Sequence, residues 1–211
     1  MLGRRLLGTR WIAVHAEQTP NPEALMFYLD KGKDVLGANS KSMTFTDKYD
    51  CGKSALASSL FRVHGVSSVL LGPKHITINK QPQFEWQALR PNLELVIGQF
   101  FETGMPAARP DAIEKLVVDE KKEATELEER ILSLLEERVR PFVQQDGGDL
   151  EFVSFDVQSG LVTVRMQGAC SGCPKSAVTL KMGIERMLKH YIPEISGVIN
   201  IDSPDTEDAV Q

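Results

Sequence analysis

Two cysteines separated by two residues, Cys170 and Cys173, are the side chains of this sequence best suited to chemistry. Pro174 follows them at once and opens a predicted helix, at a position that proline favours. The N–H groups at the start of a helix stabilise a thiolate relative to a thiol. Two thiolates at this spacing grip one face of a metal ion or cluster, whereas a cubane iron–sulfur cluster or a tetrahedral zinc site takes four ligands.

The residues around the pair suit a bulky anionic ligand. Gly168 and Gly172 let the backbone come close to such a ligand, and Arg165 and Lys175 add positive potential. The remaining cysteine of the chain, Cys51, lies far upstream, and we expect it to be a partly buried thiol near the start of a helix.

Three interpretations of the cysteine pair stay open from the residues alone. In the first, both cysteines are structural, either as small hydrophobic side chains or as zinc ligands, although two cysteines on either side of Ser-Gly in an exposed turn fit this less well. In the second, the Cys170/Cys173 dithiol belongs to a thiol–disulfide oxidoreductase, because thioredoxin-like folds also place a C-x-x-C at a helix start after a strand. The intervening Ser-Gly and the short chain that remains after the motif count against it. In the third, two chains share one cluster, and each chain gives two thiolates.

The elements that position the cysteines form a predicted module over residues 123–203. Apolar residues at helical or alternating spacing mark its elements, and one face of its strands is polar. The predicted order is α-β-β-α-β: a helix that starts at a capping box (125–128) and ends or bends at Pro141, a turn at 146–149, strands at 151–157 and 162–167, a helix at 174–191 and a strand at 198–201. In the turn at 146–149 we expect a structural role, with the glycines making the turn and the aspartates capping.

Residues 17–105 form a second predicted module, of the α/β type. A Gly-Pro-Lys turn at 72–74 indicates a hairpin in its middle. The predicted strands are 23–29, 42–46, 66–71 and 75–79, and the predicted helices are 54–64 and 84–102, with Pro91 marking a kink or a helix start. Residues 106–122, with prolines and charges, are predicted to link the two modules.

The two ends of the chain differ from these modules. Residues 1–16 carry arginines interleaved with leucine and tryptophan at near-helical spacing, and no acidic residue, which is typical of a mitochondrial presequence. Residues 204–211 are predicted to be an acidic tail.

Composition excludes several classes of protein. The net charge of −5 and the lack of a basic stripe argue against a nucleic-acid partner. Three cysteines cannot all pair in disulfide bonds within one chain, which argues against a secreted domain stabilised by disulfides. No apolar run reaches the ~20 residues that a membrane span needs. A soluble protein of one large or two small domains is expected.

Several segments carry a more specific likeness. Pro-Phe-Val-Gln-Gln-Asp-Gly-Gly-Asp at 141–149, Met-Gln-Gly-Ala-Cys-Ser-Gly-Cys-Pro at 166–174 and Leu-Lys-Met-Gly-Ile-Glu at 180–185 resemble the C-terminal domain of NifU-like (Nfu-type) iron–sulfur scaffold proteins. Four other segments resemble the N-terminal domain of the mitochondrial members of this family: Gln-Thr-Pro-Asn-Pro at 18–22, Phe-Arg-Val-His-Gly-Val at 61–66, Leu-Gly-Pro at 71–73 and Phe-Glu-Trp at 84–86.

The resemblance implies an α+β protein of two small domains, an N-terminal α/β Nfu-type domain and a C-terminal α-β-β-α-β NifU-like domain with helices on one face of a small sheet. It implies a scaffold or carrier of the mitochondrial matrix, and not an enzyme, that binds a [4Fe-4S] cluster and transfers it to apo-proteins. Cys170 and Cys173 take the ligand positions, and Cys51 matches none. The implied partners are a second copy of the chain bridged by the cluster, upstream cluster-assembly proteins, and recipients such as lipoyl synthase and respiratory subunits.

Overall fold

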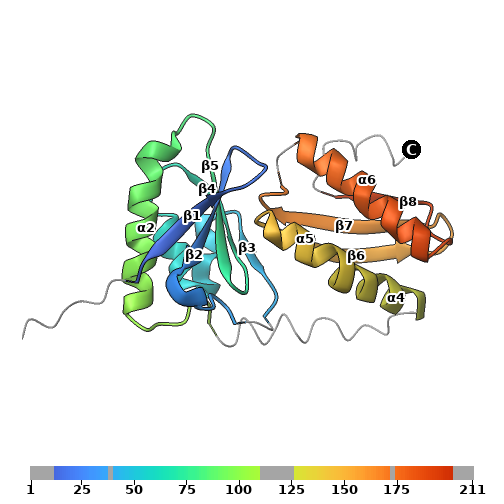
Figure 1. Cartoon of the computed structure of the whole chain (residues 1–211), viewed down its shortest axis with the longest axis horizontal. Coiled ribbons are helices and arrows are strands. Elements are labelled where there is room, and N and C mark those ends of the chain that lie inside the picture. Colours follow the sequence, from blue (N-terminus) through green and yellow to red (C-terminus); the bar gives the residue numbers. More distant parts are fainter. Residues whose placement is uncertain (1–11, 38–39, 110–125, 172–173, 202–211) are drawn as a thin grey trace, which may run out of the picture.

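The computed structural model describes residues 12–37, 40–109, 126–171 and 174–201. Within these ranges the chain forms two domains that lie side by side, each with one sheet and its own helices (Figure 1). The N-terminal domain holds a five-stranded sheet and the C-terminal domain a three-stranded one. This is the α+β arrangement of two small domains that the sequence predicted. In the described part of the chain, no helix has the length and apolar character needed to cross a bilayer.

The N-terminal sheet is antiparallel throughout, in the order β1-β2-β5-β4-β3. All the strands that the sequence predicted here are present within one residue of their expected bounds. The strands are β1 (Val14–Gln18), β2 (Ala24–Leu29), β3 (Met43–Phe45), β4 (Val66–Leu71) and β5 (His75–Lys80).

Strand β1 begins inside the segment 1–16 that the sequence analysis assigned to a leader. It pairs with β2, and Ile12, Val14 and Ala16 pack against the core of the domain. The folded domain therefore includes residues from Ile12 onward, and a leader that ended at residue 16 would take most of β1 with it. The arginines of the expected leader lie outside the described residues.

Two helices, α1 (Ala55–Leu60) and α2 (Trp86–Glu102), pack on one face of this sheet, and short 3₁₀ turns, η1 (Asp30–Gly32) and η2 (Lys48–Lys53), connect other elements. Helix α1 is shorter than predicted, because after Leu60 the backbone turns with i→i+3 bonds, such as Val63 N–H to the Leu60 carbonyl at 3.0 Å. Pro91 lies inside α2 and does not begin it.

Part of the predicted linker packs onto the N-terminal domain. Ala107 and Ala108 are buried, and the Ala107 carbonyl accepts a 2.6 Å hydrogen bond from Ser54 Oγ, which also caps α1 through the Ala57 N–H. The N-terminal domain therefore extends to about residue 109, beyond the expected boundary at 105. The rest of the linker and the tail 204–211 lie outside the described residues.

The first helix of the C-terminal domain passes through Pro141 by changing its hydrogen-bond pattern. Helix α4 (Glu126–Leu134) leads into a π-helical stretch, η3 (Leu135–Val139), and then into α5 (Arg140–Gln145). A proline lacks the N–H for an i→i−4 bond, and the wider π turn accommodates that gap. The sequence predicted that Pro141 ends or bends the helix, and its predicted capping box lies partly outside the described residues.

The C-terminal sheet combines a hairpin with one parallel strand. Strands β6 (Gly148–Asp156) and β7 (Leu161–Gly168) are antiparallel, and β8 (Gly197–Asn200) runs parallel to β7 after a crossover through α6 (Pro174–Tyr191). Strand β6 starts three residues earlier than predicted, because Gly148 already pairs with Gly168 and is not left in the turn. The order α-β-β-α-β is as predicted.

Each domain has its own hydrophobic core. In the C-terminal domain both the α4–α5 helix and α6 contribute to one cluster on one face of the sheet, and the opposite face carries polar pairs such as Arg165 with Glu151 at 3.0 Å. The cluster includes Ile131, Val143, Val162, Val164, Ile184, Leu188 and Val198. A separate cluster lies between the N-terminal sheet and α1 and α2.

Because the two clusters are separate, we predict that a fragment of residues 123–203 folds alone. It should give dispersed amide resonances in NMR spectra and one cooperative thermal transition. An unfolded fragment would mean that the C-terminal fold depends on its contact with the N-terminal domain.

Candidate metal centre at the cysteine turn

Cys170 lies in a tight turn between the end of β7 and the start of α6. Its N–H donates to the Gln167 carbonyl at 3.3 Å, and Ser171 donates to the Gly168 carbonyl through its N–H (3.2 Å) and its Oγ (2.8 Å). Gly168 has a positive φ of 65°, and a Cβ there would lie 2.6 Å from the Gly147 carbonyl oxygen. The turn therefore needs glycine at 168. The second predicted ligand, Cys173, lies outside the described residues.

The Cys170 thiol points into the domain, against Gly148. An ideal Cβ on Gly148 would sit 2.3 Å from Cys170 Sγ and 3.1 Å from the Gln167 carbonyl oxygen. Cys170 is only 6% exposed and belongs to the C-terminal core cluster. From the C-x-x-C motif we expected an exposed turn. In this structure the thiol is turned inward, so Cys170 must reorient before it can coordinate a metal.

The Asp-Gly-Gly-Asp segment supports this arrangement. Gly147 has a φ of 77° and makes the turn after α5. Asp149, 3% exposed, forms an ion pair with Arg140, whose Nε lies 3.2 Å from Asp149 Oδ1. Arg140 Nη2 also donates to the Leu150 carbonyl at 2.9 Å. The sequence analysis assigned the aspartates to capping, but Asp149 instead helps to fasten α5 to β6 beside Gly148.

The N-terminal domain contacts the cysteine turn directly. Asn21 Nδ2 donates to the Ala169 carbonyl at 3.0 Å and approaches the Ser171 carbonyl at 3.4 Å, and Asn79 Nδ2 donates to the Gly168 carbonyl at 3.0 Å. Nothing in the sequence pattern pointed to this contact, because the partners lie in different domains.

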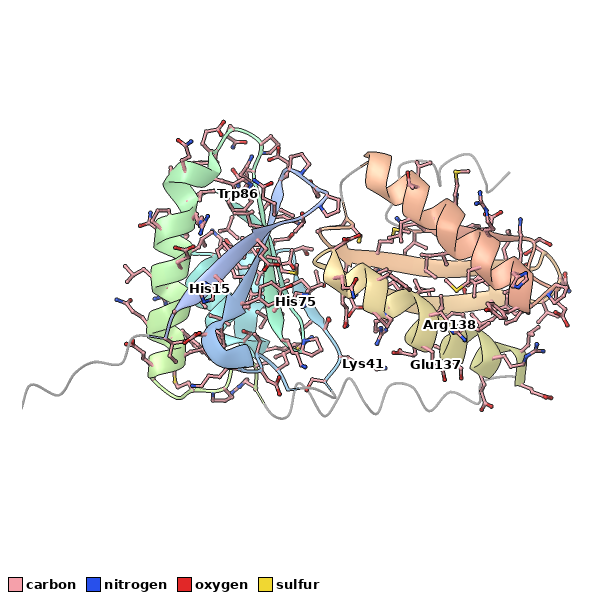
Figure 2. The ribbon with its side chains drawn as sticks, in the orientation of Figure 1. His15, Lys41, His75, Trp86, Glu137 and Arg138 are labelled. Carbon is pink, nitrogen blue, oxygen red and sulfur yellow. The ribbon has the colours of Figure 1, made fainter. Side chains whose placement is uncertain are left out.

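Two titratable groups on this side of the N-terminal domain have perturbed pKa values. Burial lowers the pKa of His75, and the nearby Asp149 carboxylate partly opposes that shift, so that the imidazole is neutral at pH 7. The pKa of Lys41 is also lowered, first by burial and then by the charge of Arg140. Figure 2 shows both side chains on the side of the N-terminal domain that faces the C-terminal domain.

The other cysteine and the other histidines lie away from the turn. Cys51 is 3% exposed in η2, and its thiol donates to the Asp47 carbonyl at 3.3 Å. His64 packs edge-on against the Phe84 ring, and His190 lies in the last turn of α6. Among the described residues, no three His, Cys, Asp or Glu side chains are grouped as a metal site.

The comparisons with known proteins agree with the two-domain architecture. A family model described as a NifU-like domain matches residues 131–199, and one described as the N terminus of scaffold protein Nfu/NifU matches residues 14–104. A curated relative from Drosophila erecta, named "NFU1 iron-sulfur cluster scaffold homolog, mitochondrial", is 40% identical over 93% of this chain and 70% of its own length. The chain belongs to the Nfu/NifU family.

Other relatives extend the same likeness. "NifU-like protein 4, mitochondrial" from Arabidopsis thaliana is 40% identical over 90% of this chain and 66% of its own length, so the chain spans about two thirds of such relatives. A solution NMR structure of a NifU-like protein from Saccharomyces cerevisiae is 26% identical and covers 52% of this chain and 95% of its own, with a TM-score of 0.45.

The family matches place the features described above in known domains. The NifU-like match includes the cysteine turn and Gly148, and the Nfu N-terminal match includes Asn21 and Asn79. The sequence pattern singled out the cysteines and the motifs but gave no sign of the role of Asn79 in β5, nor of two positions inside the motifs. One is Gly148, whose only signal was a second glycine in a turn that needed one. The other is Asn21, inside the Pro-Asn-Pro segment.

We predict that Gly148→Ala disturbs Cys170 specifically. The added methyl group occupies the place of the sulfur, so the thiol must swing outward or β6 must shift, at a cost of about 1–3 kcal/mol of folding free energy. Thermal unfolding and the rate of Cys170 alkylation measure the two effects.

Gly183→Ala is the matched control, because a Cβ at this position of α6 meets nothing within 4 Å. It should leave alkylation unchanged and stabilise the helix by up to ~1 kcal/mol. Equal behaviour of the two variants would contradict the close contact at Gly148.

Proposed function

We propose that this protein is an iron–sulfur cluster scaffold or carrier that takes up a [4Fe-4S] cluster at Cys170 and Cys173 and passes it to apo-proteins. The observation that carries the proposal is a cysteine turn at a helix start in a chain of the Nfu/NifU family, whose relatives are named iron–sulfur cluster scaffolds. The protein is a scaffold and not an enzyme, since the cluster is cargo that leaves unchanged.

The chemistry of the turn suits a transient hold on such cargo. A cubane cluster takes four thiolates, and one chain offers two at close spacing, so two chains complete the coordination. The N-terminus of α6 favours the thiolate forms and the net negative charge of a thiolate-bound cluster. A cluster held between two chains is also easily released, because a recipient that supplies further thiolates can replace the two thiolates of one chain at a time.

The place and the partners follow from the same proposal. Relatives named as mitochondrial support a mitochondrial protein, and we assign it to the matrix. There it receives its cluster from upstream assembly proteins and delivers it to recipients such as lipoyl synthase and respiratory subunits.

Cys170→Ala and Cys173→Ala are each expected to abolish cluster binding while the fold survives, because each removes half of the chain's share of ligands. The measurement is iron and sulfide content after anaerobic reconstitution, with Mössbauer spectra for cluster type and circular dichroism for the fold. Cys51→Ser is the control and should bind as much cluster as the wild type, since Cys51 lies in the core of the other domain. A folded Cys170→Ala or Cys173→Ala chain that keeps its cluster would refute the ligand assignment.

The oligomeric state of the protein should depend on whether the cluster is bound. Cluster-free protein has no ligand-based reason to dimerise, whereas the loaded protein should be a dimer with four irons per two chains. Size-exclusion chromatography with light scattering, before and after reconstitution and again after chelation, measures this. A monomer that holds a full cubane would rule out the shared site and indicate that a small thiol completes the coordination.

A further inference from the structure

The two faces of the N-terminal sheet are covered by different parts of the chain. Ile76 and Ile78 on β5 point to the helices, whereas Thr77 points the other way, together with its neighbours Met26 on β2 and Leu70 on β4. These last three side chains are at most 2% exposed although none of them belongs to the helix-covered core. The C-terminal domain buries them, and its backbone at Gly147 and Gly168 comes close enough that a Cβ at either position would crowd side chains of the N-terminal domain.

The distances define that fit. A Cβ on Gly147 would lie 3.0 Å from Thr19 Cγ2 and 3.1 Å from Thr77 Oγ1, and a Cβ on Gly168 would lie 3.0 Å from Leu70 Cδ1. Gly147 and Gly168 flank Gly148 and the cysteine turn in the β6–β7 pairing. The second face of the N-terminal sheet is therefore shaped to the end of the C-terminal sheet that carries Cys170.

The turn between β1 and β2 is pre-organised to hold the cysteine turn. Asn21 Oδ1 accepts the Glu23 N–H at 3.0 Å, which leaves the amide NH₂ group directed at the carbonyls of Ala169 and Ser171. Thr19 Oγ1 accepts the Asn21 N–H at 3.2 Å from one side. Asn21 is 4% exposed.

Other residues of the N-terminal domain hold this β1–β2 turn in place. Trp86 Nε1 donates to the Pro22 carbonyl at 2.9 Å, and Lys80 forms an ion pair with Glu23 while lying over the Trp86 ring. Asn79 adds a second amide from β5, with its Nδ2 shared between Ser68 Oγ at 2.8 Å and the Gly168 carbonyl at 3.0 Å. Two rigid amides thus approach the backbone carbonyls on both sides of Cys170.

We propose that the second face of the N-terminal sheet, with Asn21 and Asn79, is a binding surface for the cysteine turn of the same chain, and that it competes with a second copy of the chain for that turn. While the amides hold the carbonyls of residues 168, 169 and 171, the backbone of the turn is fixed with the Cys170 thiol turned in against Gly148. Sharing a cluster between two chains requires the thiol to turn out, so the N-terminal domain must move off first. This competition rests on the proposed function, whereas the binding surface does not.

The contact between the two domains has the polar character of a reversible interface. Within the described residues, three polar atoms on this face of β5 are buried without a hydrogen-bond partner: His75 Nε2, Thr77 Oγ1 and Asn79 Oδ1. Buried polar atoms regain hydrogen bonds to water when the domains part, so this face is not finished as a permanent core. Covalent geometry lets the sixteen residues 110–125 between the domains span up to roughly 50 Å, so the connection does not force the domains together.

The test uses the full chain with Cys51 and Cys173 replaced by serine, which leaves Cys170 as the reporter. Asn21→Asp keeps the oxygen that accepts the Glu23 N–H but replaces the donating NH₂ group with an oxygen that faces two carbonyls. Asn79→Asp makes the same exchange at Gly168. Alkylation by iodoacetamide under native conditions reports the population in which the thiol is open. The radius of gyration from small-angle X-ray scattering reports separation of the domains.

Both aspartate variants are expected to speed alkylation of Cys170 by about tenfold or more, because each loses a hydrogen bond across the contact and gains a repulsion. The radius of gyration should rise with them. Gln83→Glu is the control, since it adds the same charge at an exposed amide whose Nε2 donates to Gln81 Oε1 in the same domain. It should change neither quantity.

Folded aspartate variants with unchanged alkylation would overturn the proposal, and so would faster alkylation without any rise in the radius of gyration.

A third measurement separates this proposal from the proposed function. Wild-type, Asn21→Asp and Asn79→Asp chains that keep all cysteines are reconstituted with iron and sulfide. Failure of all three to bind a cluster refutes the scaffold function and leaves the binding surface to be judged by alkylation and scattering alone. Cluster loading that is slower in the aspartate variants than in the wild type would overturn the competition.

Discussion

The cysteine turn depends on the contact between the Cys170 sulfur and the backbone of Gly148. The hairpin register places Gly148 opposite Gly168, so two residues without side chains meet at the open end of the C-terminal sheet. The thiol lies in that gap, and Cys170 belongs to the core cluster of the domain. Asp149, the residue after Gly148, forms the ion pair with Arg140 that fastens α5 to β6. A side chain at Gly148 would push the sulfur out of its place, whereas a side chain at Gly168 would meet the Gly147 carbonyl oxygen.

Local chemistry was enough to predict most elements and the place of the cysteines. Runs of apolar or β-branched residues predicted β4 and β5, and alternation predicted β7, each nearly to the residue. Pro174 after the cysteine pair located the start of α6. The errors have physical reasons. Strand β1 was missed because its apolar residues continue the pattern of the arginine-rich segment before it. Asp149 was assigned to capping because its partner, Arg140, becomes a neighbour only when α5 lies along β6.

The burial of Cys170 was beyond prediction from one sequence for a related reason. A C-x-x-C before a helix suggests an exposed turn, since the motif alone contains nothing large enough to cover it. Here the cover comes from Gly148, more than twenty residues earlier in the chain, and the turn is held by Asn21 and Asn79 from the other domain. Contacts at such separations follow from how two domains fit together, and no periodicity in the sequence reports them.

The parallel pairing of β7 with β8 has a consequence for how the C-terminal domain can change shape. A parallel connection must cross the sheet through a helix, so α6 leaves the sheet where β7 ends and is anchored to the core by Ile184 and Leu188. Within the C-terminal domain, both ends of the cysteine turn are thereby held by packed elements, so once the N-terminal domain has moved off, the thiol can turn outward without unfolding β7 or α6. Under the proposed function, exchange of the cluster would then be a local event of low free energy inside a domain whose global unfolding is costly. Under the same proposal, separate sets of substitutions would alter the speed of cluster delivery and the heat resistance of the fold.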